Sequence, residues 1–193
     1  LPTKNSYRII SLAENGHIEI YLFDKKTHLL SKFNERSLFG SQNSNTCHVI
    51  CTSRSRNFLF VAASDNKIYQ ISSSGTVIKK IIVENSSFYR QAIKSIRANV
   101  YGDRLLVVYN DNQIQLISIE IKTEDGEPTS NCTVLFQKTF DAKFKIKKGC
   151  YFPNPNCFVI AVMEKAVNQY FMLTFDIRDE NCLKTLTEIK KDK

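Results

Sequence analysis

Several residue types and patterns that mark particular protein classes are missing from this chain of 193 residues. It contains no tryptophan, and its six glycines stand singly, so no glycine-rich phosphate-binding loop is present. No apolar run approaches the roughly 20 residues that a membrane-spanning helix requires. The first residues show neither an initiator methionine nor the apolar core of a signal peptide. We therefore expect no nucleotide chemistry and no membrane partner, and we expect the chain to be part of a longer protein.

Residues suited to catalysis are equally scarce. Nucleophilic catalysis requires a serine or cysteine together with a histidine and an orienting carboxylate. The only histidines are His17, His28 and His48, and the first two flank an expected hairpin, where an exposed turn or strand end is the simplest role. Cys150 and Cys157 would approach each other if the turn between them closes a hairpin, although buried thiols are the simpler interpretation. We therefore predict no enzymatic activity, no cofactor and no metal site.

Charge is the first positive signal in the sequence. The chain has 27 Lys and Arg against 19 Asp and Glu, a formal net charge of +8, and its pI is about 9.2. Such an excess favours an acidic partner, which is nucleic acid, an acidic protein segment or an anionic surface. The alternative is that the net charge only keeps the protein soluble, because the basic residues are spread along the chain.

An internal repeat is the strongest structural signal. Residues 59–72 (LFVAASDNKIYQIS) match residues 105–118 (LLVVYNDNQIQLIS) without a gap, at an offset of 46 positions. Each copy is an apolar segment, a turn of the type Asp-Asn, and a second apolar segment. Asn and Asp accept a positive φ and bond their own backbone, so the chain reverses there at little steric cost. Each copy is therefore predicted to form one β-hairpin, and we expect Val61, Ile68, Val107 and Ile114 to be buried between sheets.

Further strands surround these two hairpins. Looser copies of the hairpin occupy residues 7–22 and 158–177, and candidate flanking strands lie at residues 47–52, 77–83, 92–98, 132–140, 144–151 and 183–189. Apolar and polar residues alternate with period two in several of these segments, which is typical of strands. Only residues 88–96 have a pattern that would suit a short helix. The sequence therefore predicts an all-β domain over residues 1–193 with about four repeats, at approximately 1–40, 41–90, 91–140 and 141–193.

Four-stranded units repeated at this period resemble the blades of the WD40-type β-propeller family. The resemblance rests on the hairpin pattern and the period, because the Gly-His and Trp-Asp dipeptides of that family are absent. It implies blades of four antiparallel strands, and about four blades are too few to close a ring. A larger propeller, completed by the parent chain or by a partner, is thus the expectation. Other propeller-like folds and β-sandwiches are the alternatives.

Basic side chains are the candidate binding residues. Lys143, Lys145 and Lys147 alternate with apolar residues, so a strand there would present three lysines on one face. Arg54 and Arg56 precede the hairpin of residues 59–72, in a position where successive blades collect loops on one rim. The alternative interpretation is solvated charge that protects the edge of a sheet from pairing with another chain. Two long loops, at residues 31–45 and 121–130, are either recognition loops or disordered insertions.

The predicted function follows from the combination of predicted propeller blades with the lack of a recognisable group of catalytic residues. We expect a non-catalytic scaffold that binds other protein subunits in a multi-subunit complex. The six cysteines are dispersed in a chain large enough to fold without disulfides, which indicates a reducing compartment. Because the chain has blades but no catalytic set, we expect an intracellular location, with the nucleus favoured over the cytoplasm. The alternative is a nucleic-acid-binding or RNA-processing accessory propeller with RNA or DNA as partner.

Overall fold

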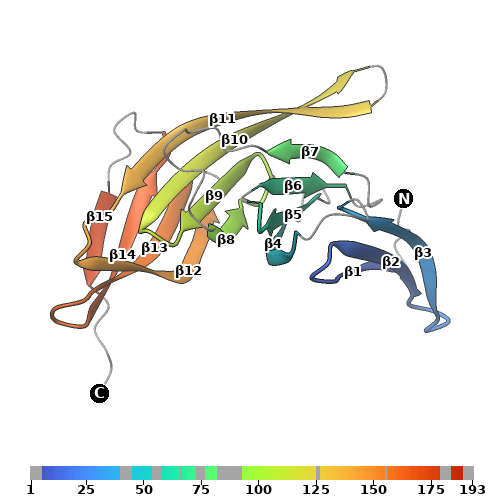
Figure 1. Cartoon of the computed structure of the whole chain (residues 1–193), viewed down its shortest axis with the longest axis horizontal. Helices are drawn as coiled ribbons and strands as arrows, with labels where there is room; N and C mark the ends of the chain where they lie inside the picture. Colours follow the sequence, from blue (N-terminus) through green and yellow to red (C-terminus); the bar gives the residue numbers. More distant parts are fainter. Residues whose placement is uncertain are drawn as a thin grey trace.

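The computed structural model of the chain describes residues 6–39, 45–53, 58–65, 67–72, 77–81, 93–124, 127–154, 156–178 and 184–188. These residues form four antiparallel sheets that follow one another along the chain and fan out in an arc from the first sheet to the last (Figure 1). No helix occurs among them, so the described part of the chain contains none that is long and apolar enough to span a membrane. The all-β prediction is confirmed.

Each sheet is a simple meander in which strands adjacent in sequence are paired. The first sheet has three strands and the other three have four each. In chain order the strands are β1 (Ser6–Leu12), β2 (His17–Asp24) and β3 (Leu30–Ser37); β4 (Cys47–Ser53), β5 (Phe58–Ala63), β6 (Ile68–Ile71) and β7 (Val77–Ile81); β8 (Ile93–Ala98), β9 (Arg104–Tyr109), β10 (Gln113–Glu124) and β11 (Glu127–Thr139); and β12 (Phe144–Asn154), β13 (Cys157–Glu164), β14 (Gln169–Asp176) and β15 (Lys184–Glu188).

The two copies of the repeat form equivalent hairpins in neighbouring sheets, as predicted. Leu59 pairs with Ile71 across β5 and β6, and Leu105, 46 positions later, pairs with Ile117 across β9 and β10. The first hairpin turns at Asp65, whose carboxylate accepts a hydrogen bond of 3.1 Å from the backbone of Lys67. Strands also lie at each of the predicted flanking segments, so the count of about four strands per repeat holds for the last three sheets.

Three hydrophobic clusters fill the spaces between successive sheets. The second and third sheets therefore bury both of their faces, which explains why β5 and β9 are continuously apolar rather than alternating. The four residues expected in the core are all 0% exposed: Val61, Ile68, Val107 and Ile114. The prediction of their burial is confirmed.

Two predictions about loops were wrong. Residues 31–45 were expected to form a loop, yet β3 occupies Leu30–Ser37 and pairs along β2. Its side chains are nearly all exposed, so no apolar alternation marks it as a strand. Residues 121–130 were also expected to form a loop, but β10 and β11 extend through most of this segment as a long ribbon (Figure 1), with Glu124 paired to Glu127. Of residues 88–96, where a short helix was considered, only 93–96 are described, and they belong to β8.

Candidate functional site

The predicted lysine face is formed at the start of β12. Lys145 is exposed and Lys147 is half-buried, whereas Ile146 between them is fully buried and Phe144 packs against the core. Lys143 is exposed in the turn that precedes the strand. The predicted alternation is present over residues 144–147, whereas Lys143 precedes the strand and its ammonium group lies 5.1 Å from the ring centroid of Phe144. Arg54 and Arg56, the other two candidates, lie outside the described residues.

Apolar side chains accompany these lysines on the outer face of the last sheet. Lys145 is opposite Met163, and Met163 is in turn opposite Tyr170 on β14, so cross-strand pairing places the three on one face. The ammonium group of Lys147 lies 5.4 Å from the ring centroid of Tyr170, within the range of a cation–π interaction. The hydrophobic cluster of this sheet involves its opposite face. We call Lys145, Lys147, Met163 and Tyr170, together with Lys143 in the adjoining turn, the lysine face.

The edge of β12 is joined to the neighbouring sheet. The side-chain amide of Asn112 donates a hydrogen bond of 2.7 Å to the carbonyl of Phe144, and its oxygen accepts one of 3.3 Å from the backbone of Ile146. Lys94 of β8 donates a further hydrogen bond to the Ile146 carbonyl. Because other parts of the same chain already bond this end of the edge, protection against pairing with a second chain is a weak explanation for the lysines.

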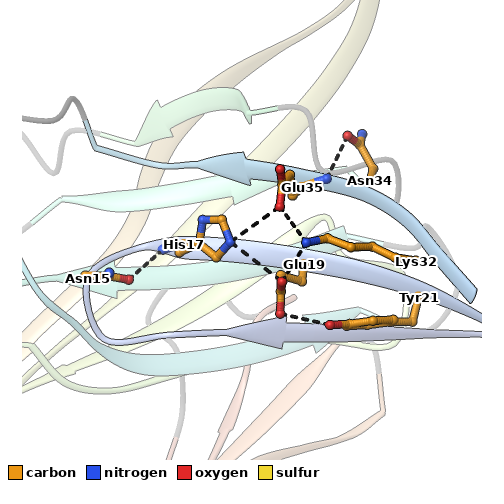
Figure 2. Close-up of polar contacts among 7 residues, drawn as sticks. All are labelled: Asn15, His17, Glu19, Tyr21, Lys32, Asn34 and Glu35. Carbon is orange, nitrogen blue, oxygen red and sulfur yellow. Dashed lines mark hydrogen bonds and ion pairs between the residues drawn. The ribbon is translucent and has the colours of Figure 1, made fainter.

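A second polar cluster lies on the outer face of the first sheet (Figure 2). The ammonium group of Lys32 on β3 donates hydrogen bonds of 2.8 Å to Glu19 and 2.5 Å to Glu35. The imidazole Nε2 of His17 lies 3.8 Å from the Glu19 carboxylate and 3.9 Å from that of Glu35. The hydroxyl of Tyr21 donates a 3.0 Å hydrogen bond to the other oxygen of Glu19. We call His17, Glu19, Lys32 and Glu35 the His–Glu cluster.

The protonation of this cluster follows from its hydrogen bonds. The bond from Lys32 lowers the pKa of Glu19 and of Glu35, and the two carboxylates together raise the pKa of Lys32 well above its ordinary value. The hydrogen bond to Glu19 raises the pKa of Tyr21. Glu19 and Glu35 are therefore ionised beside the charged ammonium group of Lys32 near neutral pH.

Sequence reasoning placed His17 at a strand end but did not find its partners. Glu35 and Lys32 fall in the segment expected to be a loop, and their approach to His17 depends on the register between β2 and β3. The only signal available was the alternation His17-x-Glu19, which puts both side chains on one face of a strand. That signal is weak without knowledge of the opposite strand.

Cysteine chemistry gets no support from the described thiols. Cys51 is buried, and this burial raises the pKa of its thiol to about 12. Burial likewise raises the pKa of Cys47 to about 11. A thiol is a poor nucleophile unless it ionises, and these two groups stay protonated at neutral pH. Cys51 is part of the hydrophobic core, whereas Cys47 is half-buried at its margin.

A shallow polar pocket of about 330 Å³ lies on the third sheet. Arg104 lines this pocket, donates a 2.9 Å hydrogen bond to the hydroxyl of Ser118 and lies 3.7 Å from the Asp103 carboxylate. The remaining lining residues are Ile119, Glu120, Asn131 and Thr133. No histidine or cysteine is among the lining residues.

Comparison with solved structures identifies the architecture. The C-terminal WD40 domain of Sif2 superposes with a TM-score of 0.58 at 14% identity, covering 96% of this chain and 45% of that one. The β-propeller domain of Cps50 (Swd1) from Myceliophteria thermophila gives 0.56 at 10% identity, with coverages of 96% and 70%. Hsv2 from Kluyveromyces marxianus gives 0.55 at 12% identity, with coverages of 97% and 56%.

This chain thus spans about half the length of most of these structures, with Cps50 (Swd1) the exception. No family model matches the sequence, and no curated protein matches it either. Identities this low show the fold alone. The four sheets are a partial WD40-type β-propeller, as the resemblance in the sequence implied.

Proposed function

We propose that this partial WD40-type propeller is a non-catalytic scaffold subunit of an intracellular, and specifically nuclear, multi-subunit complex, and that its lysine face binds an acidic segment of another protein. Propellers of this type generally serve as protein-interaction domains. The observation that carries the proposal is the combination of exposed Lys145 with Met163 and Tyr170 on one sheet face, with the ammonium group of Lys147 beside the Tyr170 ring.

The chemistry of the lysine face suits an acidic partner with some apolar residues. Lysine ammonium groups attract carboxylates over long distances and accelerate encounter. Met and Tyr are enriched at the centres of protein interfaces, where a flexible thioether and an amphipathic ring provide contact area. A rigid sheet holds the backbone of these residues in place, so the backbone loses little conformational entropy when the partner binds.

Nucleic acid is the second candidate, supported by the net charge of +8 and by the aromatic ring of Tyr170 beside Lys147. Phosphate binding by lysines, with a ring available for base stacking, is the common arrangement for single strands. The two candidates differ in salt dependence, because each neutralised phosphate releases condensed counterions.

Replacing Lys143, Lys145 and Lys147 together by Glu is expected to leave the fold intact and to weaken binding of an acidic peptide at least about tenfold at low salt. Reversing three charges opposes the attraction, while exposed charges contribute little to stability. Fluorescence anisotropy with a labelled Glu-rich peptide containing Phe and Leu measures the affinity. The same titration with single-stranded oligo(U), over a salt series, measures the alternative.

A matched control separates local from overall charge. The double variant Lys143→Glu/Lys145→Glu is compared with Lys25→Glu/Lys26→Glu, which changes the net charge equally but lies in the turn between β2 and β3 of the first sheet. Equal losses in both double variants would contradict a binding site on the lysine face. A loss for oligo(U) alone would replace the protein-scaffold proposal by the nucleic-acid one.

A further inference from the structure

The geometry of the His–Glu cluster points to a zinc site: we propose that His17, Glu19 and Glu35 bind one Zn²⁺ ion in exchange for the ammonium group of Lys32. The three ligand atoms, one from each side chain, lie within 4.8 Å of one another. Nitrogen and oxygen ligands bind zinc at about 2.0–2.2 Å, which separates tetrahedral neighbours by about 3.4 Å. The distances of 3.8 and 3.9 Å from His17 are therefore closed by small side-chain rotations.

The pairing of β2 and β3 places His17, Glu19 and Glu35 close together without a bound metal. His17 and Glu19 are two residues apart on β2, so their side chains share a face. Glu35 is directly opposite Glu19 on β3, and the side chains of cross-strand neighbours lie close enough to bind the same metal ion. His17 and Glu19 of β2 and Glu35 of β3 thus form a triangle, and the sheet holds their backbone positions.

A β-bulge brings Lys32 into the same triangle. Lys32 and Glu35 are three residues apart, an odd spacing that normally puts two side chains on opposite faces of a strand. The register shifts by one residue between Ile20 and Tyr21, so that Lys32 faces Tyr21 on the same side as Glu35. The ammonium group consequently lies between the two carboxylates (Figure 2).

Lys32 therefore marks the cation position and competes for it. Its side chain is 43% exposed, so it can turn outward into solvent, where an ammonium group is fully hydrated. The Tyr21 hydroxyl bonds the Glu19 oxygen that does not face Lys32, and such an outer hydrogen bond orients a ligating carboxylate. One imidazole with two carboxylates is a ligand set for zinc, whereas Ca²⁺ and Mg²⁺ require more oxygen ligands. Three protein ligands leave a fourth position for water or for a donor from a partner.

Isothermal titration calorimetry with ZnCl₂ in a buffer that does not bind zinc is the direct test. We expect one Zn²⁺ per chain and no comparable signal from Mg²⁺ or Ca²⁺. His17→Gln and Glu35→Gln should each weaken binding at least about tenfold, because loss of even an outer partner of a metal ligand typically weakens affinity by about 10- to 100-fold. His28→Gln is the matched control, since His28 is exposed and its ring stacks on Phe23, away from the carboxylates. It should leave the affinity unchanged.

Lys32→Met separates a metal site from a simple ion-pair network. Removing the competing ammonium group should tighten zinc binding at least about tenfold, because zinc then displaces neither of the two charge-assisted hydrogen bonds from Lys32 to Glu19 and Glu35. An ion-pair network without metal affinity would bind zinc neither in the wild-type chain nor in Lys32→Met. The proposal is overturned if neither the wild-type chain nor Lys32→Met binds one Zn²⁺. It is also overturned if His17→Gln binds as tightly as His28→Gln, because the metal would then lie on other ligands such as the cysteines.

Discussion

Replacing Phe158 by alanine is expected to lower the free energy of unfolding by about 3–5 kcal/mol, the usual range for deleting a buried phenylalanine ring. Phe158 is 0% exposed, and its ring stacks on that of Phe175 at 4.7 Å between centroids, 5° from parallel. The rings of Phe136 and Phe152 each lie 6.2 Å away. Removing the ring opens a cavity at the centre of the cluster between the third and fourth sheets, which the surrounding strands cannot fill.

Urea unfolding followed by far-UV circular dichroism measures this effect, because the chain has no tryptophan to report by fluorescence. Val167→Ala is the control: Val167 is 56% exposed in the turn between β13 and β14. Its replacement should change stability by no more than about 0.5 kcal/mol. If Phe158→Ala also lost less than about 1 kcal/mol, the last sheet would not pack on the third through this ring.

The second large effect is expected at Asn112, where alanine should lower stability by about 2–4 kcal/mol. Asn112 has a φ of 67°, a conformation that Asn accepts more readily than Ala. Its side chain also makes both of the hydrogen bonds that join the turn of β9 and β10 to Phe144 and Ile146. Alanine removes these two bonds, so that the part-buried carbonyl of Phe144 and the N–H group of Ile146 lose their Asn112 partner. Alanine also adds backbone strain.

Two further variants divide this loss into its causes. Asn112→Gly removes the hydrogen bonds without the strain, so it should be about 1 kcal/mol less damaging than alanine. Asn168→Ala adds only strain, because exposed Asn168 has a φ of 52° and no side-chain hydrogen bond with any described residue. Thermal or urea unfolding of the three variants gives the comparison. Equal effects of Asn112→Ala and Asn168→Ala would contradict a bridging role for Asn112.

The repeat is the part of the fold that was predictable. Residues 59–72 and 105–118 carry apolar strands with an Asp-Asn turn, and these local signals suffice because a hairpin forms between neighbours in sequence. The flanking strands followed from alternation. By contrast, β3 was missed because most of its side chains are exposed. A strand held mainly by backbone hydrogen bonds to β2 leaves no apolar pattern in the sequence.

The candidate sites divide in the same way. Alternation along β12 was enough to predict that Lys145 and Lys147 oppose Ile146, since side chains in a strand change face at every residue. That the face beside them carries Met163 and Tyr170 required the pairing with β13 and β14. The His–Glu cluster required still more, because a single bulge determines on which side of the sheet Lys32 lies.

The sequence by itself thus determined the all-β class, the repeat and the buried positions, because these depend on patterns within a hairpin. Only the tertiary structure decided which sheet faces are covered, how the turn at Asn112 joins two sheets, and which charged groups meet on the first sheet. The physical reason is that register and sheet stacking bring together residues distant in the chain. A shift of one residue, which hardly changes the local pattern, moves a side chain to the opposite face.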